Sequence, residues 1–319
     1  MSFQNATTVW KNGQLVPWED ATVHLSAHGL HYGTGVFEGI RCYDTPEGPA
    51  VFRLREHIAR MFASAWLHNI PIPFTQDELV QATLETVAAN GLSSAYVRPI
   101  VFFGSGSLGL LPNACPTEVA IMAWEWALLL GADSAEKGIR ATISSWQKFD
   151  SNAMPATAKA CGQYLNSVLA TREARTRGYH EALLLNSAGN LAEGAGENLF
   201  LVKNKTLMTN GQADDVLLGI TRDTVIQLAR ENGYQVTTRS LTKLDLLAAD
   251  EAFVTGTAAE IVPLCEVDGY EIGDGHRPVT RVLQQAFRDA VQGRDPNHTD
   301  WLSFVPSRQS AQSEVEVRA

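Results

Sequence analysis

The sequence predicts a two-domain fold, with an α+β first half followed by a mixed α/β second half. The chain has 319 residues. Short apolar runs typical of strands alternate with longer runs that have helical periodicity along most of the chain. A polar stretch of small residues, GADSAEKG at 131–138, separates the two halves. We therefore expect a small α+β domain over 1–130, a linker over 131–138, a large domain over 139–306 and a disordered tail over 307–319.

Turn residues and apolar spacing define the elements of the first half. Asn-Gly at 12–13 tolerates positive φ and predicts a hairpin over 9–16. Apolar residues three and four apart predict a helix over 54–68. TQDE at 75–78 is a capping box that begins a second helix, and Gly91 ends it. Further strands are expected over 21–25, 35–43, 50–53, 95–103 and 118–124.

The second half alternates strands with helices and shows no internal repeat. Helices are expected over 164–176, 222–232, 241–248 and 278–291. Strands are expected over 139–146 and near residues 181, 198, 206, 235, 251 and 261.

Composition excludes several classes of function. A net charge of -10 argues against a nucleic-acid-binding surface. The four cysteines have neither metal-ligand nor disulfide-framework spacing, so no metal is expected. The N-terminus lacks the pattern of a signal peptide, and no apolar run approaches the ~20 residues of a membrane span. We expect a cytoplasmic protein whose partners are small molecules, with no nucleic acid and no membrane.

Two short motifs carry the chemistry. PATAKA at 155–160 places Lys159 among residues small enough to let a flat ring approach, and Tyr164 follows closely. EGAGENLF at 193–200 opens with Glu193 and continues with three small residues. A lysine, a tyrosine and a carboxylate are the groups that a pyridoxal phosphate (PLP) ring needs. Taken alone, Lys159 is more typical of a lysine that extends its charge to solvent beside a helix start, and Glu193 of a surface turn.

With HYGTGVFEGIR at 31–41, these motifs resemble the fold-type IV PLP enzymes, most closely the branched-chain amino acid aminotransferases. The resemblance extends from about residue 9 to 305. It implies a D-amino acid aminotransferase-like fold with a large PLP-binding domain. It also implies a transferase of amino-acid biosynthesis that moves the amino group between branched-chain L-amino acids (leucine, isoleucine, valine) and 2-oxoglutarate or glutamate. Members of the family are homo-oligomers, so the resemblance implies a homodimer or a homohexamer.

The resemblance assigns roles to matching residues of this chain. Lys159 is the catalytic residue, which forms the imine with the cofactor (the internal aldimine) and carries a proton. Tyr164 donates to the phenolic oxygen of the cofactor, and Glu193 keeps its ring nitrogen protonated. The other implied cofactor residues are Arg60, Leu217, Ile220, Thr221 and Thr257. The implied substrate residues are Tyr32, Phe37, Gly39, Tyr96, Arg98, Leu108, Thr257 and Ala258.

Several of these residues also have ordinary structural interpretations. Arg60 follows Glu56 by four residues and is typical of a solvated helix pair. Phe37 and Tyr96 are equally typical of core aromatics. Glu197 and Asn198 are expected to brace the strand rather than to touch the cofactor.

Strand alternation places Tyr96 and Arg98 on one face, and Pro99 suggests that their strand is bulged or lies at a sheet edge. The substrate pocket must accept both an apolar side chain and the γ-carboxylate of glutamate. A guanidinium at its rim can meet the acid and otherwise remain solvated, and the resemblance places Arg98 there.

Alternatives on the same scaffold are D-amino acid or amine transamination and an aminodeoxychorismate lyase. A non-catalytic PLP-binding protein is a further alternative. The chain departs from the usual family pattern at Cys161, Gln163, Leu218 and TNG at 209–211. These departures remove no catalytic group, but they leave the substrate range open.

Overall fold

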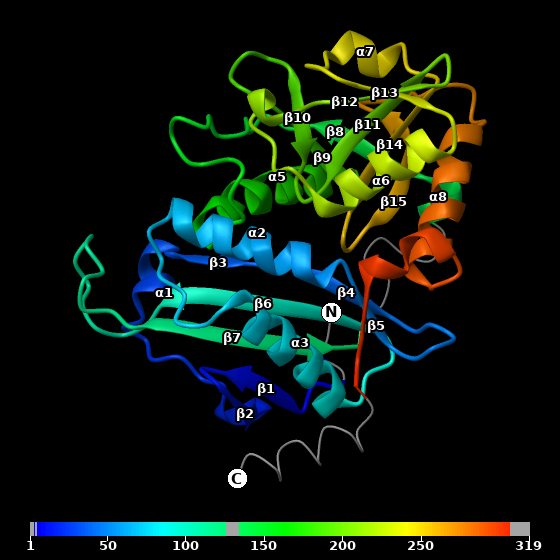
Figure 1. Cartoon of the computed structure of the whole chain (residues 1–319). Coiled ribbons are helices and arrows are strands. Elements are labelled where there is room, and N and C mark those ends of the chain that lie inside the picture. The colour runs from blue at the N-terminus through cyan, green and yellow to red at the C-terminus, as the bar shows by residue number, and fades with distance from the viewer. Residues whose placement is uncertain (1–2, 4, 126–133, 307–319) are drawn as a thin grey trace. The chain divides into compact units, whose positions relative to one another are not determined.

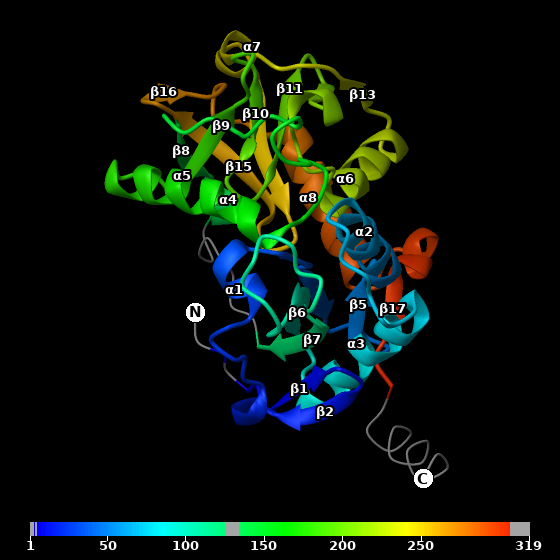
Figure 2. The same cartoon turned by 90° about the vertical axis from the view of Figure 1, so that its left-hand side faces the viewer.

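The computed structural model describes residues 3, 5–125 and 134–306 (Figures 1 and 2). The predicted tail over 307–319 and residues 131–133 of the predicted linker lie outside them. The chain packs as two compact units. The first contains the described residues up to 127, together with 158–162 and those from 289 onward, and the second contains the rest.

The first unit is built on a sheet of antiparallel strands in the order β17-β5-β4-β6-β7-β1-β2, with β3 also paired to β6. Its strands are β1 Thr8–Lys11, β2 Gln14–Pro17, β3 Gly35–Phe37, β4 Ile40–Tyr43, β5 Ala50–Phe52, β6 Ala95–Phe103, β7 Thr117–Trp124 and β17 Leu302–Phe304. Its helices include α1 His28–Tyr32, α2 Leu54–Leu67 and α3 Gln76–Asn90, with short 3₁₀ turns at Trp18–Asp20 and Pro296–Trp301.

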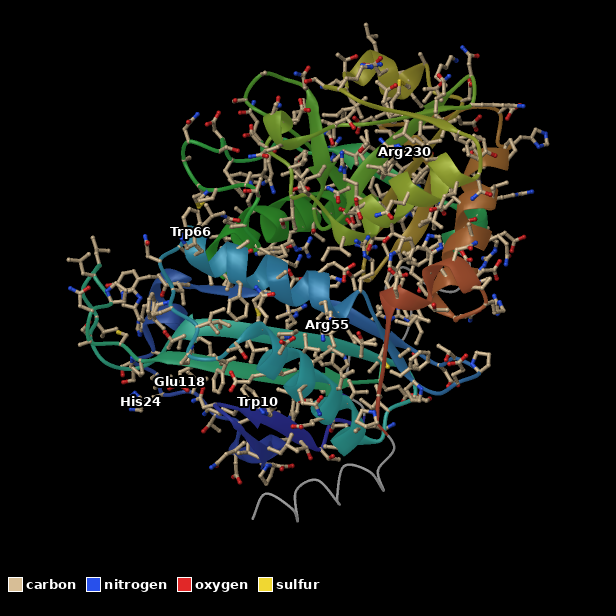
Figure 3. All side chains as sticks on the ribbon, viewed as in Figure 1. Trp10, His24, Arg55, Trp66, Glu118 and Arg230 are labelled. Carbon is tan, nitrogen blue, oxygen red and sulfur yellow. The ribbon has the colours of Figure 1, made fainter. Side chains whose placement is uncertain are left out.

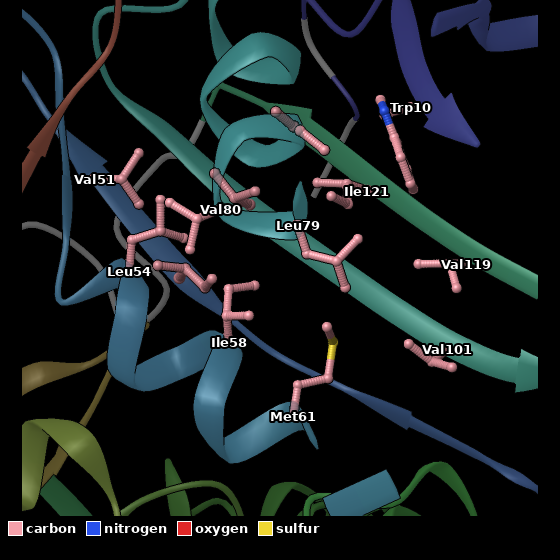
Figure 4. Packing of buried hydrophobic residues seen from close by; sticks show 14 of the residues in the cluster. Trp10, Val51, Leu54, Ile58, Met61, Leu79, Val80, Val101, Val119 and Ile121 are labelled. Atoms are coloured by element: carbon pink, nitrogen blue, oxygen red, sulfur yellow. The ribbon is translucent and has the colours of Figure 1, made fainter. Parts of the chain in front are cut away.

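Helix α2 packs one apolar face on this sheet. Leu54, Ile58 and Met61 are completely buried and point toward the strands (Figure 4). The other side of the helix is exposed, and it carries Arg55 and Trp66 (Figure 3). This division follows from the helical spacing of the apolar residues, so the predicted helix over 54–68 is confirmed almost to the residue.

Local signals predicted the neighbouring elements well. The turn of the β1–β2 hairpin lies at Asn12 and Gly13, which both have positive φ. Helix α3 begins with the full capping box at Thr75 and ends at Gly91 in a left-handed conformation. The strand expected over 21–25 is wrong, because the described backbone there forms no strand.

Pro99 lies in the middle of the sheet, so the prediction of an edge strand is wrong. Strand β6 pairs with β7 on one side and with β3 and β4 on the other. The backbone N–H of Glu38 donates to the Pro99 carbonyl oxygen at 2.9 Å. Proline has no N–H to return that bond. The strand predicted over 35–43 is therefore interrupted opposite Pro99, between β3 and β4.

The second unit is built on a mixed sheet in the order β10-β9-β8-β15-β14-β11-β12-β13, with β16 also paired to β15 (Figure 2). The β8–β9, β8–β15 and β12–β13 pairs are parallel. Its strands are β8 Ile139–Ile143, β9 Glu181–Leu185, β10 Leu191–Gly194, β11 Asn198–Lys203, β12 Thr206–Thr209, β13 Gln235–Thr238, β14 Glu251–Gly256, β15 Glu260–Val267 and β16 Tyr270–Glu271. Its helices include α4 Ser134–Lys137, α5 Tyr164–Thr176, α6 Ile220–Glu231, α7 Lys243–Leu247 and α8 Pro278–Val291.

An antiparallel sheet with helices and a mixed sheet with helices confirm the predicted α+β and α/β halves. The predicted linker begins outside the described residues and ends in α4 and Gly138. Two segments of the predicted large domain pack with the first unit. Residues 158–162 lie against β3, and β17 pairs with β5. Among the described helices, none combines the length and the apolar character that a bilayer span requires.

Candidate active site

The predicted site residues fall into two sets, one in each unit, and each set is described by itself. The first unit holds Tyr32, Phe37, Gly39, Arg60, Tyr96, Arg98, Leu108 and Lys159. The second unit holds Tyr164, Glu193, Leu217, Ile220, Thr221, Thr257 and Ala258.

The segment that carries Lys159 is held by hydrogen bonds at both of its backbone groups. The Lys159 carbonyl oxygen accepts from the backbone N–H of Phe37 at 3.0 Å. The backbone N–H of Lys159 donates at 3.0 Å to Oγ of Ser64, a buried residue of α2. Further along, a Cβ on Gly33 would lie 2.6 Å from the Gly162 Cα, so the chain requires glycine there. The lysine therefore starts from a fixed backbone.

The amine of Lys159 lies in a positively charged and poorly hydrated environment. Its Nζ is 5.1 Å from the centre of the Phe37 ring. Burial, and next the guanidinium of Arg60, lower the pKa of Lys159 from 10.5 to about 8, although Glu38 acts in the opposite direction. About a tenth of this lysine is thus a neutral amine at pH 7, far more than for an unperturbed lysine, and the neutral amine is the nucleophilic form.

Arg60 is bound by a buried carboxylate, Glu38, that no sequence signal identifies. Glu38 is completely buried, and its two oxygens accept from Nε and Nη2 of Arg60, each at 2.8 Å. Nδ1 of His57 also lies 2.8 Å from Glu38 Oε2. Burial alone would raise the pKa of Glu38, but Arg60 and His57 lower it well below its usual range. Glu38 is therefore a carboxylate that fixes the Arg60 guanidinium close to Lys159.

Four predicted substrate residues of the first unit come together. Arg98 Nη2 donates to the Tyr96 hydroxyl at 3.2 Å, so the two side chains share one face of β6, as predicted. The Arg98 guanidinium lies 4.7 Å from the centre of the Phe37 ring. A Cβ on Gly39 would lie 2.0 Å from the Tyr96 hydroxyl, so only glycine admits this tyrosine. Within the described residues, the buried Nε of Arg98 has no hydrogen-bond partner.

Tyr32 and Leu108 form a separate contact. The Tyr32 hydroxyl donates to the Leu108 carbonyl oxygen at 2.7 Å, and both side chains are exposed. The Tyr32 ring also packs beside the buried His28. These contacts hold the loop of Leu108 against α1.

In the second unit, Glu193 is a buried residue of β10 and not a surface turn carboxylate. Its Oε1 lies 2.6 Å from Nζ of Lys148. Its Oε2 accepts from the backbone N–H of Leu217 at 3.1 Å and from Nδ2 of Asn198 at 3.2 Å. We refer to Glu193, Lys148, Asn198 and Leu217 as the Glu193 cluster. Three donors on two oxygens leave this carboxylate with a fixed orientation.

Asn198 links this cluster to the start of α6. Its Nδ2 also donates to the Leu217 carbonyl oxygen at 2.8 Å. A Cβ on Gly219 would lie 2.1 Å from Asn198 Oδ1, so glycine is required at the residue that precedes the helix. Ile220 and Thr221 form the first turn of α6, where backbone N–H groups point out of the helix and favour an anion.

Glu197 braces the small-residue loop that precedes β11. Its Oε2 accepts from the backbone N–H of Gly196 at 3.0 Å, and its carbonyl oxygen accepts from Gly194 at 2.7 Å. Glu181 accepts from the backbone N–H of Ala195 at 3.0 Å. Burial, and next the charge of Glu181, raise the pKa of Glu197 well above its usual range. The protonated form of Glu197 is therefore favoured beside Glu181.

Of the remaining predicted residues, Thr257 and Ala258 lie at a turn and Tyr164 begins a helix. Thr257 and Ala258 follow β14, where a Cβ on Gly256 would lie 3.3 Å from the Gly196 carbonyl oxygen. Their turn thus borders the small-residue loop. Tyr164 is the first residue of α5. Gln163, which differs from the usual family pattern, donates through Nε2 to the Pro155 carbonyl oxygen at 3.0 Å.

Cys161, another departure from the family pattern, packs in the space that a glycine leaves. A Cβ on Gly35 would lie 3.2 Å from the Cys161 Sγ. Burial raises the pKa of the Cys161 thiol to about 11, so it remains protonated and does not compete with Lys159 as a nucleophile.

The residues missed from the sequence are Glu38, His57, Ser64 and Lys148. Glu38 lies inside the motif at 31–41, so its position was noted but its partners were not. His57 and Ser64 lie on the predicted helix over 54–68, and helical spacing gave no sign of their contacts. Lys148 precedes the lysine motif without any pattern that identifies it.

Known proteins resemble this chain over nearly its whole length. The family profile described as amino-transferase class IV matches residues 35–267. A branched-chain-amino-acid aminotransferase of Escherichia coli strain K12 is 46% identical over 307 residues, which cover 96% of this chain and 99% of that protein.

Solved structures agree with the sequence comparison. The crystal structure of the Escherichia coli branched-chain amino acid aminotransferase has a TM-score of 0.92 at 46% identity and covers 94% of this chain and 100% of its own. The T.th branched-chain amino acid aminotransferase complexed with N-(5'-phosphopyridoxyl)-L-glutamate has a TM-score of 0.90 at 44% identity. It covers 94% of this chain and 99% of its own.

Proposed function

Since the chain belongs to the amino-transferase class IV family, we propose that it is a PLP-dependent branched-chain-amino-acid aminotransferase. It moves the amino group between branched-chain L-amino acids and 2-oxoglutarate. The predictions of the family, the fold, the cofactor and this activity are confirmed by the similarity to the relatives and solved structures. The roles of individual residues remain proposals.

The observation that carries the residue assignments is the state of Lys159. Its backbone is fixed at both hydrogen-bonding groups, and its pKa is lowered to about 8. A lysine that only extends its charge to solvent needs neither property. An amine that must attack a carbonyl carbon and later accept a proton needs both.

The residues present also meet the requirements of PLP. When bound, PLP supplies a carbonyl group for the amine and a ring that withdraws electrons from the substrate Cα. We propose that Glu193, a buried and oriented carboxylate, pairs with the protonated ring nitrogen. Tyr164 would donate to the phenolic oxygen, and Leu217 and Thr257 would contact the ring and its substituents.

The phosphate would lie at the start of α6. Ile220 and Thr221 offer the N–H groups of the first helical turn, and the N-cap residue Gly219 has no side chain to compete for them. Arg60 would add positive charge on the side of Lys159. Its guanidinium is already oriented by Glu38, so binding an anion costs little further order.

The first unit supplies the substrate residues of this proposal. Phe37, Gly39 and Tyr96 present an apolar surface for a leucine, isoleucine or valine side chain. Arg98 lies at that surface with a buried Nε that lacks a hydrogen-bond partner in the described residues, so it can accept the γ-carboxylate of glutamate. The backbone N–H groups of Thr257 and Ala258 would bind the α-carboxylate, and Tyr32 and Leu108 would bound the pocket.

Lys159 Nζ then takes the proton from the substrate Cα. The lowered pKa keeps part of the amine neutral, and the small neighbours Ala158 and Ala160 allow the side chain to move. The backbone of Lys159 therefore positions the base, and its burial and charged neighbours lower its pKa.

We further propose that the enzyme is a cytoplasmic homodimer or homohexamer with a small and a large domain, in which residues 158–162 and β17 belong to the small domain. All four cysteines are free, as expected in a reducing compartment. Tyr32, Leu108 and the nearby Leu110 and Leu111 are exposed apolar residues, and association would cover them.

Half-reactions with single amino donors test this proposal. The PLP form should react with L-leucine, L-isoleucine, L-valine and L-glutamate and lose the absorbance of bound PLP, and added 2-oxoglutarate should restore that absorbance. A preference for D-alanine or for amines without a carboxylate would favour the alternative transaminases. Release of pyruvate from aminodeoxychorismate would identify the lyase, and PLP binding without any half-reaction would identify a non-catalytic protein.

A further inference from the structure

Lys148 is the charged neighbour of Glu193. Its Nζ lies 2.6 Å from Glu193 Oε1 and 4.5 Å from the centre of the Phe149 ring. Its backbone N–H donates to the Leu185 carbonyl oxygen of β9 at 2.8 Å. The exposed fractions of the two charged side chains are only 11% for Lys148 and 8% for Glu193. The ion pair is therefore fixed and largely removed from water.

The other oxygen of Glu193 is already occupied by neutral donors. Leu217 and Asn198 both donate to Oε2, at 3.1 and 3.2 Å. A carboxylate oxygen accepts about two hydrogen bonds in the plane of its group. A ring N–H that pairs with Glu193 must therefore approach Oε1, the oxygen that Lys148 already holds.

Two cations on one oxygen oppose each other. In the protein without cofactor, Lys148 neutralises a buried carboxylate that would otherwise be costly. With a protonated ring present, the same ammonium repels the ring nitrogen and shares its acceptor. An ammonium that merely oriented the carboxylate would instead strengthen the bond to the ring.

We propose that Lys148 competes with the ring nitrogen of the cofactor for Glu193, so that it stabilises the cofactor-free protein and weakens the hold of Glu193 on the protonated ring. The proposal rests on the proposed PLP-dependent function. Lys148 is a positioning residue in this account, because it acts on the cofactor through Glu193.

Pyridoxamine 5'-phosphate is the probe that isolates this effect, because it carries the same ring and phosphate but cannot form an imine with Lys159. Its affinity for cofactor-free protein is measured by fluorescence titration. Lys148→Met should bind the probe about tenfold more tightly. Removing one nearby charge typically shifts the pKa of a neighbouring group by about one unit, which is a factor of ten. Lys148→Gln keeps a hydrogen-bond donor and folds more easily, and it should bind more tightly as well. Lys148→Arg keeps the charge and should stay within about twofold of the parent.

Two further measurements separate competition from a general structural effect. Lys203→Met removes the lysine of an exposed pair, 2.7 Å from Asp250, and should leave the affinity unchanged. In a Glu193→Gln background, Lys148→Met should no longer increase the affinity for the probe, because no carboxylate remains for Lys148 and the ring nitrogen to compete for. The ¹⁵N shift of labelled probe should show more protonated ring nitrogen in Lys148→Gln than in the parent.

Equal or weaker binding by both neutral Lys148 variants overturns the competition and makes Lys148 an orienting residue. A gain that persists in the Glu193→Gln background overturns it also. If the parent protein binds the probe but fails every half-reaction, the proposed function is refuted, but the competition between Lys148 and the ring nitrogen is not. A parent that does not bind the probe refutes both.

Discussion

Replacing Lys159 by methionine should stabilise the cofactor-free protein, although it abolishes transamination. Lys159 is held in an environment that disfavours its ammonium form, through burial and through the Arg60 guanidinium. Methionine has a similar length, carries no charge and packs readily in irregular space. The substitution therefore removes an electrostatic penalty from the folded state.

The size of this gain follows from the pKa. A fall from 10.5 to about 8 corresponds to at most about 3 kcal/mol at neutral pH. Partial exposure of Lys159 and the lost contact of its ammonium with the Phe37 ring each reduce that figure, the latter by about 0.5–1 kcal/mol. We expect a net increase in the free energy of unfolding of about 1–2 kcal/mol at pH 7.

The pH dependence fixes the origin of the effect. Between pH 8 and 10.5 the unfolded parent binds more protons than the folded parent, so the stability of the parent rises with pH in that window. The penalty is complete below pH 8 and disappears above 10.5. The advantage of Lys159→Met should therefore be largest at pH 7 and should shrink by pH 9.5.

Urea unfolding of cofactor-free protein at pH 7 and pH 9.5 measures both quantities. Lys243→Met, at an exposed position of α7, is the matched control and should change stability little at either pH. A Lys159→Met protein that is less stable than the parent at pH 7, or whose advantage does not depend on pH, would refute the electrostatic account of this lysine.

Three further changes test the rest of the site. Arg98→Leu should slow the glutamate half-reaction at least about tenfold more than the leucine half-reaction, measured by stopped flow, and equal losses would make Arg98 structural. Gly219→Ala places a Cβ 2.1 Å from Asn198 Oδ1 and should weaken PLP binding about tenfold or more in a titration. Gly196→Ala, whose Cβ would have open space, is its control and should bind normally. Glu197→Gln removes a carboxyl whose pKa is raised in the folded protein. Such a carboxyl lowers the stability of the folded state as pH rises above about 4.5. The melting temperature of the variant should therefore exceed that of the parent more at pH 8 than at pH 5. An equal shift at both pH values would contradict the raised pKa of Glu197.

Elements with local signals were predicted closely, and elements made by distant pairing were not. The Asn12–Gly13 turn and the Thr75 capping box depend on residues within one turn, so the sequence reveals them. Strand β10 was missed because its four residues, LAEG, show no alternation, and it exists through pairing with β9. Glu193 therefore belongs to a buried strand, although its neighbours suggested an exposed turn.

The candidate site shows the same division. Motifs supplied Lys159 and Glu193, because the chemistry of the cofactor restricts the residue types. The charged neighbours of these groups come from elsewhere in the chain: Arg60 acts on Lys159 from α2, and Arg60 is in turn held by Glu38, 22 residues before it. Motif spacing contains no information on such contacts, since they depend on the packing of α2 against the sheet.

The network around Glu38 explains how a lysine beside a carboxylate can still have a lowered pKa. A carboxylate next to a lysine ordinarily favours the ammonium form, and Glu38 does act on Lys159 in that direction. Both of its oxygens, however, are bound by Arg60, and His57 adds a third donor. The nearby charge that then acts most strongly on Lys159 is the guanidinium, which favours the neutral amine. Burial lowers the pKa of Lys159 most, and Glu38 holds the Arg60 cation where it lowers that pKa further.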